Sequence, residues 1–188
     1  MTSEEKSAAA QRLQVSRDVL RAAVEGVSDE QWSFQPDEET WSIGQCVHHL
    51  CLTERQVLAS LRQKTATEPP RTDLQAEVAG KDELIVKRVP VRRGKAPAPA
   101  ESHPSSAAVV PRDVVAEFLK VREATIDFLE TTPANLREYF FEHFALKQLD
   151  AYQWLLLMSA HAERHAAQIA EVKTHPDYPL LATSSGLP

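Results

Sequence analysis

Histidines at particular spacings are the residues of this chain best suited to chemistry. His161 and His165 lie four apart, and residues four apart on a helix project from one face. Such a pair can occupy two coordination positions of a divalent cation. A third histidine from the His48-His49 pair would complete a site with three protein ligands and a position left for water or substrate. The spacing therefore indicates a metal centre.

A helical wheel places the His161 and His165 side chains inside the protein. At about 100° per residue, both fall at the centre of one apolar stripe, whose other members are Trp154, Met158, Ile169 and Val172. Two adjacent imidazoles in the interior would each need a hydrogen-bond partner, and charging both would have a high free-energy cost. A hydrogen-bonded pair of core histidines is the alternative that the spacing leaves open. His48 and His49 flank their own apolar stripe from opposite sides, and the wheel does not choose between them.

Three other side chains could take part. Glu54 falls in the middle of an apolar stripe, which is unusual for a carboxylate. It could orient a ligand histidine or Arg164, or act as a general base, although a buried ion pair is the simpler interpretation. Gln168, one turn after the histidine pair, could hydrogen-bond a bound water or an imidazole, or only border the core. Cys46 could bind zinc as a thiolate, but such a cysteine is more often a small core residue.

Four amphipathic segments must position these residues, and their apolar periodicity predicts helices. The predicted helices cover about 3–27, 42–64, 112–131 and 150–174. Ser42 and Asp150 each precede a glutamine by three residues, a capping-box pattern that is typical of a helix start. Residues 28–40 and 133–148 are interpreted as connections, and 175–188 as an irregular tail.

Residues 66–110 contain most of the prolines, which interrupt any long helix. A connection of this length is predicted to be an ordered crossover draped over the bundle. The sequence therefore predicts one all-α domain over residues 1–188, a four-helix bundle with the crossover between the second and third helices. His103, His143 and His175 fall outside the predicted helices and are interpreted as structural or solvated.

Composition narrows the classes of partner. The chain has 188 residues and a formal net charge of −6, which argues against nucleic acid as the main partner. Its first residues lack an apolar signal core, and no stretch approaches the roughly 18 apolar residues that would cross a bilayer. Cys46 and Cys51 are five apart in one predicted helix and are poorly placed to bridge each other, which favours a reducing compartment. We expect a cytoplasmic protein with no membrane partner.

Two stretches resemble a known family. They are Trp41-Ser42 leading to His49 and Glu54, and the run from His161 through Arg164 and His165 to Gln168. They look like the DinB/YfiT family of four-helix metalloenzymes, and the likeness covers most of the chain; residues 98–104 are similar to the crossover of some members. The resemblance implies that His49, not His48, joins His161 and His165 in binding a divalent zinc, nickel, iron or manganese ion. It also implies a homodimer.

Family members include thiol S-transferases that use low-molecular-weight thiols, a thiol-dependent isomerase and proteins labelled metal-dependent hydrolases. The resemblance therefore implies a metal-dependent enzyme acting on a small-molecule substrate, first of all by thiol transfer, with the metal lowering the pKa of a thiol or water. The alternatives are a hydrolase, a non-catalytic bundle whose helices are held together by a metal ion, and a metal-free bundle with a histidine-lined core. A basic cluster in the crossover could attract an anionic thiol; it comprises Lys87, Arg88, Arg92, Arg93 and Lys95.

Overall fold

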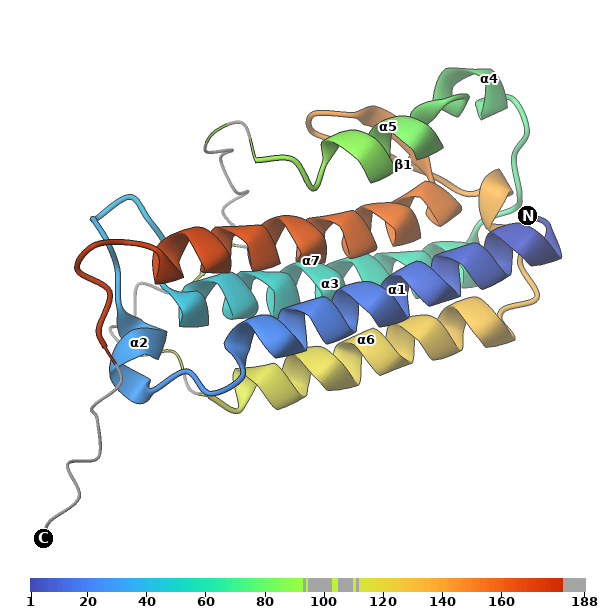
Figure 1. Cartoon of the computed structure of the whole chain (residues 1–188). Coiled ribbons are helices and arrows are strands. Elements are labelled where there is room, and N and C mark those ends of the chain that lie inside the picture. The colour runs from blue at the N-terminus through green and yellow to red at the C-terminus, as the bar shows by residue number, and fades with distance from the viewer. Residues whose placement is uncertain (93, 95–102, 105–109, 111, 181–188) are drawn as a thin grey trace, which may run out of the picture.

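The computed structural model describes residues 1–92, 94, 103–104, 110 and 112–180. Four long helices form a bundle, which confirms the predicted all-α fold (Figure 1). They are α1 Ser3–Val24, α3 Ile43–Thr67, α6 Val114–Thr131 and α7 Ala151–Lys173. Each predicted span differs from the observed one by no more than a few residues at either end.

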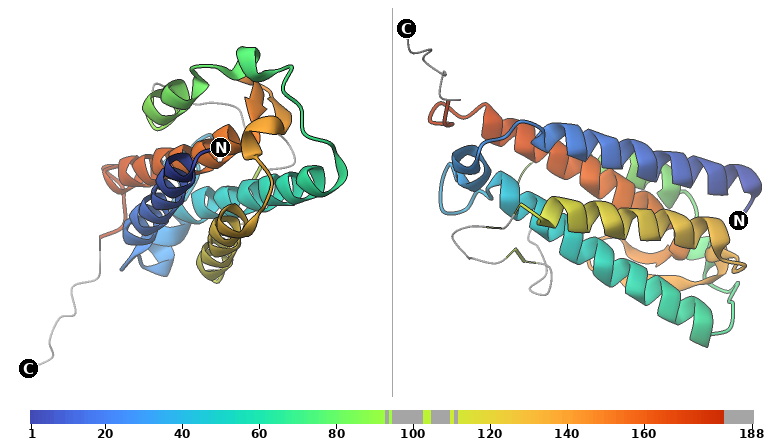
Figure 2. Two further views of the ribbon diagram at one scale, coloured as in Figure 1. Left: turned by 90° about the vertical axis from the view of Figure 1, so that its right-hand side faces the viewer. Right: turned by 90° about the horizontal axis from the view of Figure 1, so that it is seen from below.

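The order of the helices around the bundle requires a long connection. Helix α7 packs between α1 and α3, and α6 closes the ring between α3 and α1. Helices α1 and α7 run in one direction, and α3 and α6 run in the other (Figures 1 and 2). Because α3 and α6 are neighbours that run the same way, the chain must return along the whole bundle between them.

The described part of the crossover includes two short helices. It contains α4 Gln75–Val78 and α5 Lys81–Arg88. Helix α5 lies on the outer side of α7, and its Ile85 is fully buried. Residues 93, 95–102, 105–109 and 111, which include Arg93, Lys95 and much of the 98–104 stretch, lie outside the described residues, as do residues 181–188 of the tail.

Capping residues fix where the two helices that carry His49, His161 and His165 begin. The Ser42 hydroxyl accepts a hydrogen bond from the Gln45 amide, and the Gln45 side chain accepts one from the Ser42 amide. Asp150 and Gln153 make the same reciprocal pair at the start of α7. Both predicted capping boxes are therefore confirmed, and each satisfies two otherwise unpaired backbone donors.

The two predicted connections, residues 28–40 and 133–148, contain short regular elements that were not predicted from the sequence. Residues 28–40 include α2 Asp29–Ser33, which starts at a third capping box between Ser28 and Gln31. Residues 133–148 include the 3₁₀ turn η2 Leu136–Glu138 and most of a hairpin, whose strands are β1 Phe140–His143 and β2 Lys147–Asp150. These elements are four or five residues long at most, too short to show a hydrophobic period.

A polar layer divides the bundle core into two apolar clusters. One cluster lies toward the hairpin and α5, and the other lies toward α2. Between them Arg122 of α6, with no exposed area, binds both carboxylate oxygens of Glu54 on α3 (2.6 and 2.7 Å). Its Nη1 donates to the Ser16 hydroxyl of α1 (2.6 Å), and its Nη2 donates to the Met158 carbonyl of α7 (3.3 Å). One guanidinium therefore links all four helices.

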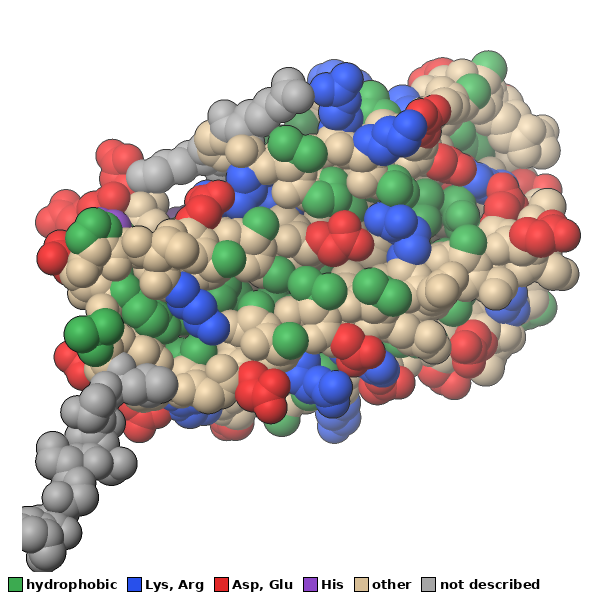
Figure 3. Space-filling view, viewed as in Figure 1, with side chains coloured by type: hydrophobic (Ala, Val, Ile, Leu, Met, Phe, Trp, Pro, Cys, Tyr) green, Lys and Arg blue, Asp and Glu red, His purple; other side chains and the backbone are tan. Residues whose placement is uncertain are grey.

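The outer surface carries charge of both signs. On the face of Figure 3, Lys and Arg side chains are interspersed with Asp and Glu side chains, and hydrophobic side chains lie between them. Within the described residues, no helix is both long enough and apolar enough to span a membrane.

Candidate metal centre

Three histidines from α3 and α7 converge at one point. The Nε2 atom of His161 lies 3.2 Å from that of His49 and 3.0 Å from that of His165. Possible ligand atoms of the three residues all lie within 4.8 Å of one another. His49 and His165 are buried, and His161 is partly exposed. The structure thus brings together the set that the family resemblance selected, and His48 lies outside it.

The contacts among the Nε2 atoms fit a set of metal ligands better than a cluster of hydrogen-bonded histidines. A neutral imidazole carries one N–H and one lone pair, so the Nε2 of His161 cannot satisfy both neighbours as a donor with a single proton. Two nitrogens held about 2.0–2.1 Å from one zinc ion stand about 3.3 Å apart in tetrahedral geometry, and about 2.9 Å apart at a right angle. The observed spacings of 3.0 and 3.2 Å fit this range.

Burial lowers the pKa of two of the three imidazoles, those of His161 and His165. Desolvation, with help from the His49 imidazole and the Arg164 guanidinium, lowers the pKa of His161 to about 3. The pKa of His165 lies well below its ordinary value because of burial and then of its two histidine neighbours. A neutral imidazole offers the lone pair that a metal needs, so no proton must be displaced near pH 7.

Trp41 covers the cluster from the side of the α2–α3 connection. Its ring stacks on that of His165, with 5.9 Å between centroids and 10° between planes, and lies 4.9 Å from that of His49. His103 of the crossover meets the indole edge-on at 5.6 Å. The packing of Trp41 over the histidines was not predicted, although Trp41 belongs to the motif that carried the resemblance.

Glu54 serves the polar layer of the core. Both of its oxygens accept hydrogen bonds from Arg122, and the side chain is 3% exposed. Arg164, with which Glu54 was considered as a pair, instead donates to the carbonyls of Val91 and Gly94 (2.9 Å each). The simpler of the two interpretations of Glu54, a buried ion pair, describes its contacts.

Gln168 borders the cluster and contacts the crossover. Its Oε1 accepts a hydrogen bond from Arg92 Nη1 at 2.9 Å, and Arg92 Nε donates to Glu171 at 2.8 Å. Arg92 comes from the predicted basic cluster, whereas Lys87 of the same cluster pairs with Glu83 on α5. The described crossover is therefore fastened to α7 beside the histidines.

The remaining candidates are not members of the three-histidine group. Cys46 is buried, and desolvation raises the pKa of its thiol to about 12, so it stays protonated near pH 7. His143 on β1 accepts hydrogen bonds at Nδ1 from the Ala145 and Leu146 amides and packs on Trp154. His175 follows α7 and packs on Phe34.

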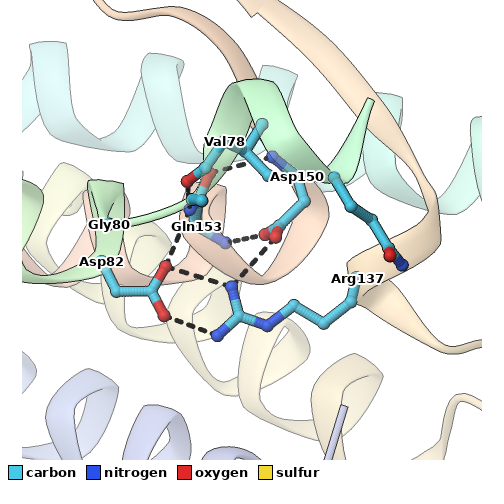
Figure 4. Close-up of a pocket in the computed structure, with 8 residues that line it drawn as sticks. Val78, Gly80, Asp82, Arg137, Asp150 and Gln153 are labelled. Carbon is cyan, nitrogen blue, oxygen red and sulfur yellow. Dashed lines mark hydrogen bonds and ion pairs between the residues drawn. The ribbon is translucent and has the colours of Figure 1, made fainter. Parts of the chain in front are cut away.

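A hollow lies away from the three histidines, at the opposite end of α7. A cavity of about 320 Å³ lies between α4, α5, η2 and the start of α7 (Figure 4). Its polar groups bind one another: Arg137 pairs with Asp82 and Asp150, and the Gln153 amide donates to Asp82 and to the Val78 carbonyl. The arrangement ties the crossover to the α7 N-terminus and leaves its named polar groups already partnered, so we assign it no ligand.

Comparisons with known proteins agree with this geometry. The chain matches the DinB superfamily over residues 12–169. It is 26% identical to the uncharacterized protein YuaE of Bacillus subtilis, covering 80% of this chain and 88% of that protein. It is 29% identical to a Geobacillus thermodenitrificans protein named "Putative metal-dependent hydrolase", covering 83% of this chain and 77% of the relative.

The fold also matches a solved structure. YfiT from Bacillus subtilis, described as "a probable metal-dependent hydrolase with an unusual four-helix bundle topology", aligns with a TM-score of 0.60. The alignment covers 92% of this chain and 88% of YfiT at 20% sequence identity. At that identity the match supports the shared fold.

Proposed function

The chain belongs to the DinB superfamily, and we propose that it is a metal-dependent enzyme of the hydrolase type that acts on a small molecule. The carrying observation is the convergence of three buried or half-buried imidazole nitrogens at spacings of 3.0 and 3.2 Å. His49, His161 and His165 would hold a zinc, nickel, iron or manganese ion. The hydrolase name of the Geobacillus relative supports the reaction class.

The protein residues supply the setting for this chemistry. A divalent ion bound by three neutral imidazoles keeps its full charge, so it would lower the pKa of a water molecule in an open position and polarise a substrate carbonyl. His161 is the partly exposed member of the set, so substrate would approach from its side. Trp41 packs over His49 and His165 and excludes water from that face.

Neither of the two candidate catalytic residues, Glu54 and Gln168, is positioned to act as a strong base. Both side-chain oxygens of Glu54 accept short hydrogen bonds from Arg122, and these contacts would have to break before Glu54 could act as a base. Gln168 does not titrate, and it accepts from Arg92. We therefore assign Glu54 a positioning role between α3 and α6, and Gln168 a role in holding the crossover.

Hydrolysis of an activated aryl ester and of an aryl amide would test the proposal. Three preparations should be compared: protein freed of metal with a chelator, the same protein reloaded with zinc or manganese, and the His165→Ala variant reloaded in the same way. We expect hydrolysis only with metal and its loss in His165→Ala, with His175→Ala as a matched control that retains activity. Equal rates with and without metal would contradict the proposal.

Thiol transfer is the second candidate. Burial is the main cause of the lowered pKa of His165, and the guanidinium groups of Arg92 and Arg164 add to it; their positive charge would favour a thiolate beside the metal. The same preparations should be given a low-molecular-weight thiol and an electrophilic aryl halide. Metal-dependent loss of thiol, with no hydrolysis of the ester or amide, would favour this reaction over hydrolysis.

A further inference from the structure

Arg92 places a largely buried positive charge beside the three histidines. Its side chain is 16% exposed, although it comes from the crossover and not from the bundle. The guanidinium donates to Gln168, one turn after His165, and to Glu171. The group therefore lies against α7, one turn beyond His165 of the candidate metal centre.

The charges around this point do not cancel. Arg164 adds a second guanidinium, and among the described residues it hydrogen-bonds to carbonyl oxygens, those of Val91 and Gly94. Glu171 supplies one negative charge, but its side chain is 57% exposed, so water weakens its effect. Glu54 is fully engaged by Arg122. Within the part of the chain that the structure describes, two cations thus face one largely solvated carboxylate, before the charge of any metal is added.

We propose that Arg92 recognises a carboxylate or similar small anionic group of the substrate bound at the three-histidine centre. The proposal rests on the proposed function and names its substrate class. A planar guanidinium can bind a carboxylate through two parallel hydrogen bonds. Because Glu171 is solvent-exposed, a substrate carboxylate would replace it on Arg92 at a low free-energy cost. Gln168 acts as a positioning residue, because its Oε1 accepts from Nη1 and holds the fork against α7.

Cobalt-loaded full-length protein allows a test that does not need the substrate. Visible absorption of the cobalt ion would follow the binding of acetate, an anion, and of imidazole, a neutral ligand. We expect Arg92→Met to weaken acetate binding about tenfold or more, the loss expected for one charge-assisted hydrogen bond. Imidazole binding should stay unchanged.

Control variants separate recognition from anchoring of the crossover. Glu171→Gln removes the competing carboxylate and should bind acetate as well as the unsubstituted protein or more tightly. Arg92→Lys keeps the charge and loses the planar fork, so its acetate affinity should lie between those of the parent and Arg92→Met; it also serves if Arg92→Met fails to fold.

Equal acetate affinity in Arg92→Met and the parent would overturn the proposal. Parallel weakening of acetate and imidazole would also overturn it, because it would show that Arg92 only anchors the crossover. If the parent protein takes up no cobalt, both this proposal and the proposed function fail. If the parent protein takes up cobalt but its acetate affinity does not depend on Arg92, this proposal fails and the proposed function stands.

Discussion

At the scale of single residues, the central feature is a set of three imidazoles that are brought together, two of which, His161 and His165, have lowered pKa values. His161 contacts two other Nε2 atoms and cannot satisfy both with one proton. Its spacing from His165 was readable from the sequence, because residues four apart share a helix face. The choice of His49 over His48 was not, since the two lie on either side of one stripe and only the packing of α3 on α7 separates them.

The metal-free protein should lose stability as the pH falls below about 6.5. Burial lowers the pKa of His161 to about 3 and that of His165 well below the ordinary value, and both recover when the chain unfolds. In this interval the unfolded chain binds more protons than the folded one. The unfolding free energy therefore rises with pH by up to about 1.4 kcal/mol per pH unit for each imidazole and levels off above about 6.5.

Denaturant unfolding of chelator-treated protein from about pH 4 to about pH 7.5 would measure this slope. Acidic groups with lowered pKa values, such as Asp82, add to it in the same direction. His161→Gln serves as the comparison, because it lacks one of the titrating imidazoles. Identical slopes in the parent and His161→Gln would contradict the assignment.

At the scale of elements, the candidate site depends on how α3 and α7 are held relative to each other. Glu54 follows His49 on α3, and Met158 precedes His161 on α7, and both are bound by Arg122 from α6. The sequence indicated that a carboxylate lay in an apolar stripe, but it could not name the partner. Arg122 is 68 residues from Glu54 in the chain, and only the tertiary packing shows the pair.

Arg122→Met should destabilise the protein strongly. The change leaves the Glu54 carboxylate buried without its cation, and losses of about 3–5 kcal/mol are typical of such a break. Replacing both partners, as Arg122→Met with Glu54→Leu, should recover much of that loss because no buried charge remains. Equilibrium denaturation of the two single variants and the double variant would measure the coupling. Additive losses would show that the pair does not act as a unit.

Gly44→Ala should disturb the docking of α2 on α3. A Cβ at Gly44 would stand 2.6 Å from Trp32 Nε1, and that nitrogen donates to the Val110 carbonyl at 2.6 Å, so the ring is held in place. We expect a loss of about 1–3 kcal/mol in unfolding free energy. In a Trp32→Phe background, which lacks Nε1, Gly44→Ala should cost less. The same cost in both backgrounds would contradict the steric explanation.

At the scale of the whole molecule, long amphipathic segments were predictable and short elements were not. The helices that carry the histidines have strong apolar periods and capping boxes at Ser42 and Asp150, so their positions follow from local sequence. The hairpin and α2 are stabilised by packing on the bundle, and a span of four or five residues is too short to show a period. The placement of Trp41 and Arg92 around the histidines depends on the path of two connections, which spacing does not encode.

The central claim is that His49, His161 and His165 bind one divalent ion, and metal content tests it most directly. Protein purified without a histidine tag, and its His49→Ala, His161→Ala and His165→Ala variants, should be assayed by elemental analysis, with His175→Ala as the matched control. We predict about one ion per chain in the parent and the control. Each ligand variant should lose metal affinity by more than the roughly 10–100-fold typical of changes outside the ligand set. No metal in the parent after incubation with zinc, nickel or manganese, or unchanged metal content in all three variants, would contradict the account.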